Sequence, residues 1–127
     1  MKKFLSILAV LMISVSLSAQ VFELRATHFR FNLSPQNPKW SDWQQVSIPV
    51  TMDFQTKRIV VFSAKQQIID YEELEREDFS DYINFSGYAT DSKYRTIYIV
   101  ITIREDGNNF LLILYDDVAY GYKMVEI

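Results

Sequence analysis

Residues 96–115 read TIYIVITIREDGNNFLLILY, and this stretch decides the fold class. An isoleucine stands at every second position from Ile97 to Ile103, which is the spacing of one face of a β-strand. The dipeptide Asp106-Gly107 then supplies a hairpin turn. A second apolar run follows from Phe110. The stretch therefore predicts an antiparallel hairpin whose isoleucine face is directed to a hydrophobic core.

The length of the hairpin loop determines which residues join this face. An even-numbered loop places the isoleucines beside every second residue from Phe110, whereas a three-residue loop places them beside the alternate set from Leu111. The choice matters because a shift of one residue moves every side chain to the other face. A second turn at Asp116-Asp117 brings Tyr120 and Tyr122 beside the Leu111 set.

Both faces of this sheet are apolar. With the isoleucines in the core, we expect Tyr98, Val100, Tyr120 and Tyr122 on the opposite face. An antiparallel sheet with one face in water alternates more cleanly, so further strands, a partner or a ligand must cover the second face. A barrel lumen would satisfy it, and about eight strands suffice for a barrel that fills with side chains or holds one small ligand.

The rest of the chain repeats short segments rich in β-branched and aromatic residues between turn-forming clusters. The segment 22–33 changes the parity of its apolar residues, which predicts a bulge near 26–28. The acidic stretch 72–81 suggests a helical turn or a mobile loop. Together these patterns predict an all-β domain, an antiparallel meander of about seven or eight strands that forms a barrel or a barrel-like sandwich.

The N-terminus has the three-part plan of a secretory signal peptide. Lys2 and Lys3 precede an apolar run over 4–17, and small residues follow at Ser18 and Ala19. The run is about fourteen residues, whereas a bilayer span needs roughly 20, so no retained membrane span is expected. We expect a signal helix at 1–19, a single β domain at 20–127, and export to the periplasm or the cell exterior.

Composition argues against several classes of function. The leader holds two lysines and no acid, so its removal changes the net charge from −3 to −5, which disfavours nucleic-acid binding. The absence of cysteine excludes thiol chemistry and most structural zinc sites. Because the glycines are isolated and form no phosphate loop, no cofactor is expected.

Candidate catalytic and metal-binding residues are few. His28 is the only histidine, and its sequence neighbours Thr27 and Phe29 offer no orienting carboxylate, so we expect a partly exposed strand residue and no catalytic residue. The acids of 70–81 match no calcium-loop spacing, which favours a solvated acidic loop and no metal site. A non-enzymatic protein is therefore expected, with a hydrolase as the less favoured reading.

Aromatic residues are the remaining candidates for a binding site. Trp40 and Trp43 either form a stacking platform for a sugar or peptide, or pack in the core or plug the barrel. Tyr98, Tyr120 and Tyr122 of the two-faced sheet complete the set of candidate ligand-binding residues.

The sequence resembles small exported β proteins of bacterial envelopes that have no assigned function. The resemblance lies in the leader ending at 16–20, the Trp40–Trp43 segment, the strand at 58–63 and the tyrosine-rich C-terminal meander. Lipocalin-like barrels are similar in size and strand count. Their Gly-x-Trp signature is absent, since Trp40 follows a proline and a lysine, so the barrel shape is an analogy that carries over no binding residues.

These observations predict an exported, non-enzymatic binding or interaction domain. Its partner is a small apolar or aromatic molecule, or a protein that covers the second face of the sheet, including a second copy in a homodimer. The alternative is a structural or inhibitory module of the periplasm or cell surface.

Overall fold

A computed structural model describes residues 21–33 and 39–127 of the chain. The expected leader and its helix lie outside these residues. The described part contains nine β-strands and no helix. The strands are β1 (Val21–Asn32), β2 (Gln44–Asp53), β3 (Arg58–Val61), β4 (Gln67–Tyr71), β5 (Glu75–Asp78), β6 (Tyr82–Asp91), β7 (Thr96–Arg104), β8 (Asn109–Leu114) and β9 (Ala119–Glu126).

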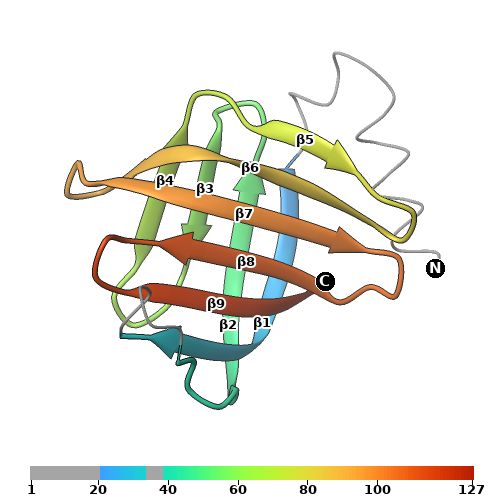
Figure 1. The fold of residues 1–127 in the computed structure, drawn as a ribbon, viewed down its shortest axis with the longest axis horizontal. Coiled ribbons are helices and arrows are strands. Elements are labelled where there is room, and N and C mark those ends of the chain that lie inside the picture. The colour runs from blue at the N-terminus through green and yellow to red at the C-terminus, as the bar shows by residue number, and fades with distance from the viewer. Residues whose placement is uncertain (1–20, 34–38) are drawn as a thin grey trace.

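The strands form an antiparallel barrel. The order in the sheet is β4-β3-β2-β1-β9-β8-β7-β6-β5, and pairing of β4 with β6 closes eight of these strands into a ring (Figure 1). β5 extends the wall along β6 as a ninth strand. The expected all-β barrel is confirmed, in preference to the sandwich.

β1 contains the predicted bulge. Leu24 and Ala26 are buried in the interior, and the register against both neighbouring strands shifts between Ala26 and His28. Beyond the shift, Phe29 pairs with Tyr122 and packs against the core. The extra residue thus lets one strand present two sets of apolar residues, of opposite parity, to the same interior.

The hairpin between β7 and β8 has the register expected for the three-residue, odd-numbered loop. Ile101 pairs with Leu111, and Gly107 adopts a φ of 85°, which is favourable only for glycine among common residues. Tyr120 and Tyr122 pair with residues of the Leu111 set and lie on the isoleucine side. The expectation that they share a face with Tyr98 and Val100 is therefore wrong, because the odd loop reverses the parity of everything that follows it.

The acidic stretch after β4 contains a strand, where a helical turn or mobile loop was expected. Residues 75–78 pair with 83–86 of β6, which satisfies part of their backbone, and Arg76 Nε lies 2.7 Å from Asp78 Oδ1. Charged side chains suit this position because β5 is the edge of the sheet. The link before it crosses β6 so closely that a Cβ on Gly87 would lie 2.7 Å from the Glu73 carbonyl oxygen.

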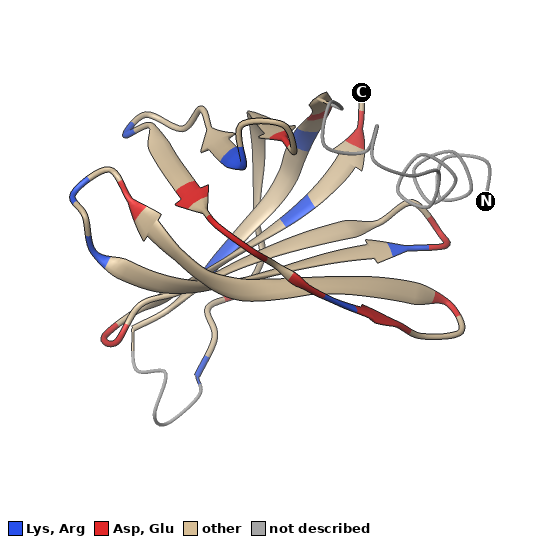
Figure 2. Ribbon diagram, turned by 90° about the horizontal axis from the view of Figure 1, so that it is seen from above, with Lys and Arg blue, Asp and Glu red and all other residues tan. Residues whose placement is uncertain are grey.

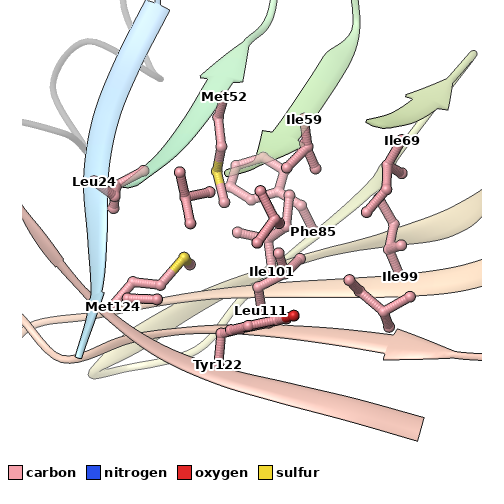
Figure 3. Close-up of a cluster of buried hydrophobic side chains, with 14 of the residues drawn as sticks. Leu24, Met52, Ile59, Ile69, Phe85, Ile99, Ile101, Leu111, Tyr122 and Met124 are labelled. Carbon is pink, nitrogen blue, oxygen red and sulfur yellow. The ribbon is translucent and has the colours of Figure 1, made fainter. Parts of the chain in front are cut away.

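Side chains fill the barrel along most of its length. Figure 3 shows apolar residues from both halves of the chain converging on the interior. At the end where Phe22, Met52, Phe54 and Met124 meet, the remaining cavity is only about 20 Å³. We call this the closed end. The expected core is thus a packed interior, and space for a ligand must be sought outside it.

Candidate binding site at the mouth of the barrel

The opposite end of the barrel holds a polar cavity of about 280 Å³, which we call the mouth. It lies where the β6–β7 and β8–β9 turns, at the left of Figure 1, meet the β3–β4 loop. Its lining residues are Lys65, Gln66, Gln67, Ile68, Asp91, Ser92, Lys93, Arg95, Tyr115, Val118 and Tyr120.

Asp91 organises one side of the mouth. Its side chain is only 8% exposed, and its two oxygens accept four hydrogen bonds. Oδ1 accepts from the backbone N–H groups of Lys93 and Arg95 at 2.9 Å. Oδ2 accepts from Arg95 Nε at 2.8 Å and from the hydroxyl of Tyr115 at 2.9 Å. Burial raises the pKa of Asp91, but these hydrogen bonds outweigh it and the net shift is downward.

The tip of the same turn is strained. Tyr94 has a φ of 62°, in the left-handed region that a bulky side chain rarely adopts, and its side chain is 90% exposed. Its N–H donates to the Asp91 carbonyl at 2.9 Å. The Asp91 hydrogen bonds thus hold a conformation that Tyr94 itself disfavours, and strain of this kind is concentrated at functional sites.

Arg95 lies across the face of an aromatic ring. Its guanidinium carbon is 4.6 Å from the ring centroid of Tyr115, while its Nε is bound to Asp91. These two contacts fix the plane of the guanidinium group. The hydrogen bond to Asp91 is the main cause of the raised pKa of Arg95.

Aromatic rings continue from the mouth into the core. Tyr115 meets Tyr120 edge to face at 6.0 Å, Tyr120 stacks on Phe29 at 6.0 Å, and Phe29 packs on Tyr122 at 5.1 Å. Tyr122 is 3% exposed, and its hydroxyl donates to Gln67 Oε1 at 3.3 Å. The mouth therefore has a floor of aromatic rings.

The phenols of Tyr115, which is partly buried, and Tyr122, which is buried, stay protonated near neutral pH. Burial raises the pKa of Tyr122 to about 12. Burial, followed by the hydrogen bond to Asp91, raises the pKa of Tyr115 to about 12. Their hydroxyl groups therefore act as hydrogen-bond donors and not as bases.

The charges that line the mouth are mostly positive. Lys65, Lys93 and Arg95 face a single carboxylate, Asp91. Among the described residues, no ion pair is formed by the ammonium group of Lys65 or Lys93. In Figure 2 the β6–β7 turn is red at the end of β6 and blue along the turn. The β8–β9 turn beside them carries Asp116 and Asp117, neither of which lines the cavity. The lining residues themselves therefore have a positive net charge.

The two tryptophans lie elsewhere, on the outer wall. The guanidinium carbon of Arg30 lies 4.6 Å from the Trp40 ring and 4.4 Å from the Trp43 ring. Ser41 holds this segment to β1 by hydrogen bonds in both directions with the backbone of Phe31. The indoles belong neither to the core cluster nor to the mouth, and each already contacts the guanidinium group of Arg30.

Tyr98 also faces outward, next to a broad open groove of about 680 Å³. The ring of Tyr98 meets the 71%-exposed Tyr88 edge to face at 5.1 Å. Acids from β4, from the link after it and from β5 line the groove, namely Asp70, Glu72, Glu73 and Glu75. The groove is larger than the mouth.

Of the five sequence-derived candidates, Tyr120 lines the mouth and Tyr122 lies beneath it. The structure brings these two together with Tyr115 and separates them from Tyr98 and from the tryptophans. Asp91 and Arg95 were missed by sequence reasoning. An Asp at the start of a short loop between two apolar strands was the available signal.

Catalytic and metal-binding groups are sparse in the described ranges. His28 Nδ1 lies 2.9 Å from the hydroxyl of its neighbour Thr27, and its ring faces Trp43 on the outer wall. Residues 21–33 and 39–127 contain no cluster of three or more potential metal ligands. They also contain no helix of the length and hydropathy that a membrane span requires.

No family model matches the sequence, and neither a curated protein nor a solved structure is significantly similar to it.

Proposed function

We propose that this protein is a non-enzymatic exported binding domain that takes a small molecule at the mouth of its barrel. The observation that carries the proposal is the mouth cavity itself, in which polar groups from three separate loops converge on a floor of tyrosine rings. Barrel mouths are common positions for such sites. The packed interior favours a ligand at the opening over one in the lumen.

Two further features support the mouth. The strained backbone at Tyr94 is maintained by a buried carboxylate, which is an arrangement found at binding loops. The lining groups also suit binding better than catalysis, because Asp91 is fully hydrogen-bonded and the phenols are held in their protonated form. Export is inferred from the expected leader at 1–19.

Native mass spectrometry of the protein purified from its own host tests the proposal. We expect extra mass that disappears on denaturation. A Ser92→Trp variant, which fills the mouth from an exposed turn, should lose that mass, and Ser80→Trp, at an exposed turn outside the mouth, should keep it. Bound mass that survives Ser92→Trp, or a bare protein in every sample, would count against a mouth site.

A protein partner is the second candidate. The outer face of β7 and β8 carries partly exposed apolar side chains on adjacent strands, including Val100 and Leu112. A face of this kind suits a partner or a second copy of the chain. A dimer in the same mass spectra would favour this candidate, and Leu112→Lys should then return the protein to a monomer.

A further inference from the structure

The ligand of the mouth belongs to a definable chemical class. We propose that it is a small planar organic anion, a carboxylate, held by Arg95 and the two neighbouring lysines. This inference rests on the proposed function, because it names the chemistry of the molecule that the mouth would take.

Arg95 is arranged as an anion receptor. Its Nε–H is already used by Asp91, and no described residue accepts a hydrogen bond from its two terminal nitrogens. The Arg95 side chain is 56% exposed, and its contacts with the ring of Tyr115 and the carboxylate of Asp91 favour one orientation of the guanidinium plane and of its terminal N–H groups. A carboxylate can accept both of them in a bidentate pair. Asp91 is therefore a positioning residue that directs Arg95.

Two lysines from different loops reinforce the positive charge. Lys93 lies on the same turn as Arg95, while Lys65 reaches the mouth from the β3–β4 loop. Asp117 interacts electrostatically with Arg95 and Asp116 precedes it in the β8–β9 turn, but neither lines the cavity, whose lining holds three cations and one acid. Unpaired cations around a partly enclosed site attract an anion and repel a cation.

The remainder of the lining selects for an apolar, planar ligand body. Ile68, Val118 and the rings of Tyr115 and Tyr120 provide apolar surface beneath the charged groups. The volume of about 280 Å³ lies just below the ~300–1,000 Å³ typical of small-molecule pockets. A single ring with one anionic group fits these limits better than a lipid chain or a peptide.

Three probes of similar shape but different charge test whether the charge of the ligand or only its shape determines binding. Benzoate, benzamide and benzamidine share one ring and a planar substituent, and they carry negative, zero and positive charge. We would titrate each into the protein and follow the backbone amide NMR signals of Lys93, Arg95 and Tyr115. We expect saturable shifts with benzoate, with an affinity at least about tenfold above that of benzamide, and no saturation with benzamidine.

Matched arginine variants test whether the anion binds at Arg95. Arg95→Gln should lower benzoate affinity at least about tenfold, because it removes both the positive charge and the pair of terminal N–H donors that a carboxylate can accept. Arg104→Gln is the control, since Arg104 lies at the other end of β7 and pairs with an acid of its own turn, Asp106, at 3.5 Å. The control should bind benzoate as the unmodified protein does. Arg95→Lys, which keeps the charge, should give an intermediate affinity.

The outcomes distinguish this inference from the proposed function. If benzamide or benzamidine shifts the mouth amides as strongly as benzoate, or if Arg95→Gln binds benzoate normally, the anion inference is overturned while a mouth site stands. If none of the probes shifts these amides and bound mass from the host also survives Ser92→Trp, the mouth site itself is overturned.

Discussion

The two ends of the barrel are built from the same eight strands, but they differ in the side chains that line them and in the space that these leave. At the closed end, Phe22, Phe54 and Met124 pack together with almost no space between them. At the mouth, a hydrogen-bonded carboxylate, Asp91, and an aromatic ring, Tyr115, support charged groups around an open cavity. The closed end is thus mainly apolar packing, whereas polar and charged side chains surround an open cavity at the mouth.

The largest expected effect is a difference in the free energy of unfolding between a variant at the closed end and a variant at the mouth. Met124→Ala should lower the free energy of unfolding by about 2–5 kcal/mol, because Met124 is fully buried and its removal leaves a cavity. Val118→Ala at the partly open mouth should cost less than about 1.5 kcal/mol. Urea unfolding of both variants checks this. Equal losses would mean that the mouth is as much a part of the core as the closed end.

The next effect concerns the carboxylate of the mouth. Asp91→Asn places an amide where four donors converge, and it should cost about 1–3 kcal/mol through unsatisfied hydrogen bonds. Asp106→Asn, in the exposed β7–β8 turn, should change stability by no more than about 0.5 kcal/mol. Thermal and urea unfolding of the pair would contradict this account if the two variants behaved alike.

Acid should act on the mouth through the same group. The pKa of Asp91 is lowered in the folded protein, so its contribution is fully present above the unfolded value of about 3.9 and is lost as the pH falls through the folded value. The unmodified protein should therefore lose more stability than Asp91→Asn between about pH 5 and pH 2. Urea midpoints at both pH values measure the difference, and parallel losses would exclude Asp91 as the source.

The smallest effect tests backbone strain at each end. Tyr94→Gly should raise stability by less than about 1 kcal/mol, because it relieves a positive φ and removes no packed side chain. Lys57, in the β2–β3 turn, has a φ of 59°, but its Nζ donates to the Glu72 carbonyl. Lys57→Gly should therefore gain less. A loss of stability in Tyr94→Gly would show that the tyrosine side chain stabilises the turn.

Sequence alone was sufficient where the information is local. The alternating isoleucines, the Asp106-Gly107 turn and the parity change in β1 each depend on a few adjacent residues, and each was found where it was predicted. The acidic stretch around β5 was misread because its charges mark an edge strand whose partner, β6, lies further along the chain.

What the sequence determined by itself was the all-β class and the approximate number of strands. Tertiary structure alone decided the faces, because one residue in the loop after Arg104 sets the parity of β8 and β9. It also decided the mouth, where pairing of β4 with β6 brings Lys65 into the same cavity as Arg95 and Tyr115. Such contacts follow from the closure of the barrel, which no local pattern of residues encodes.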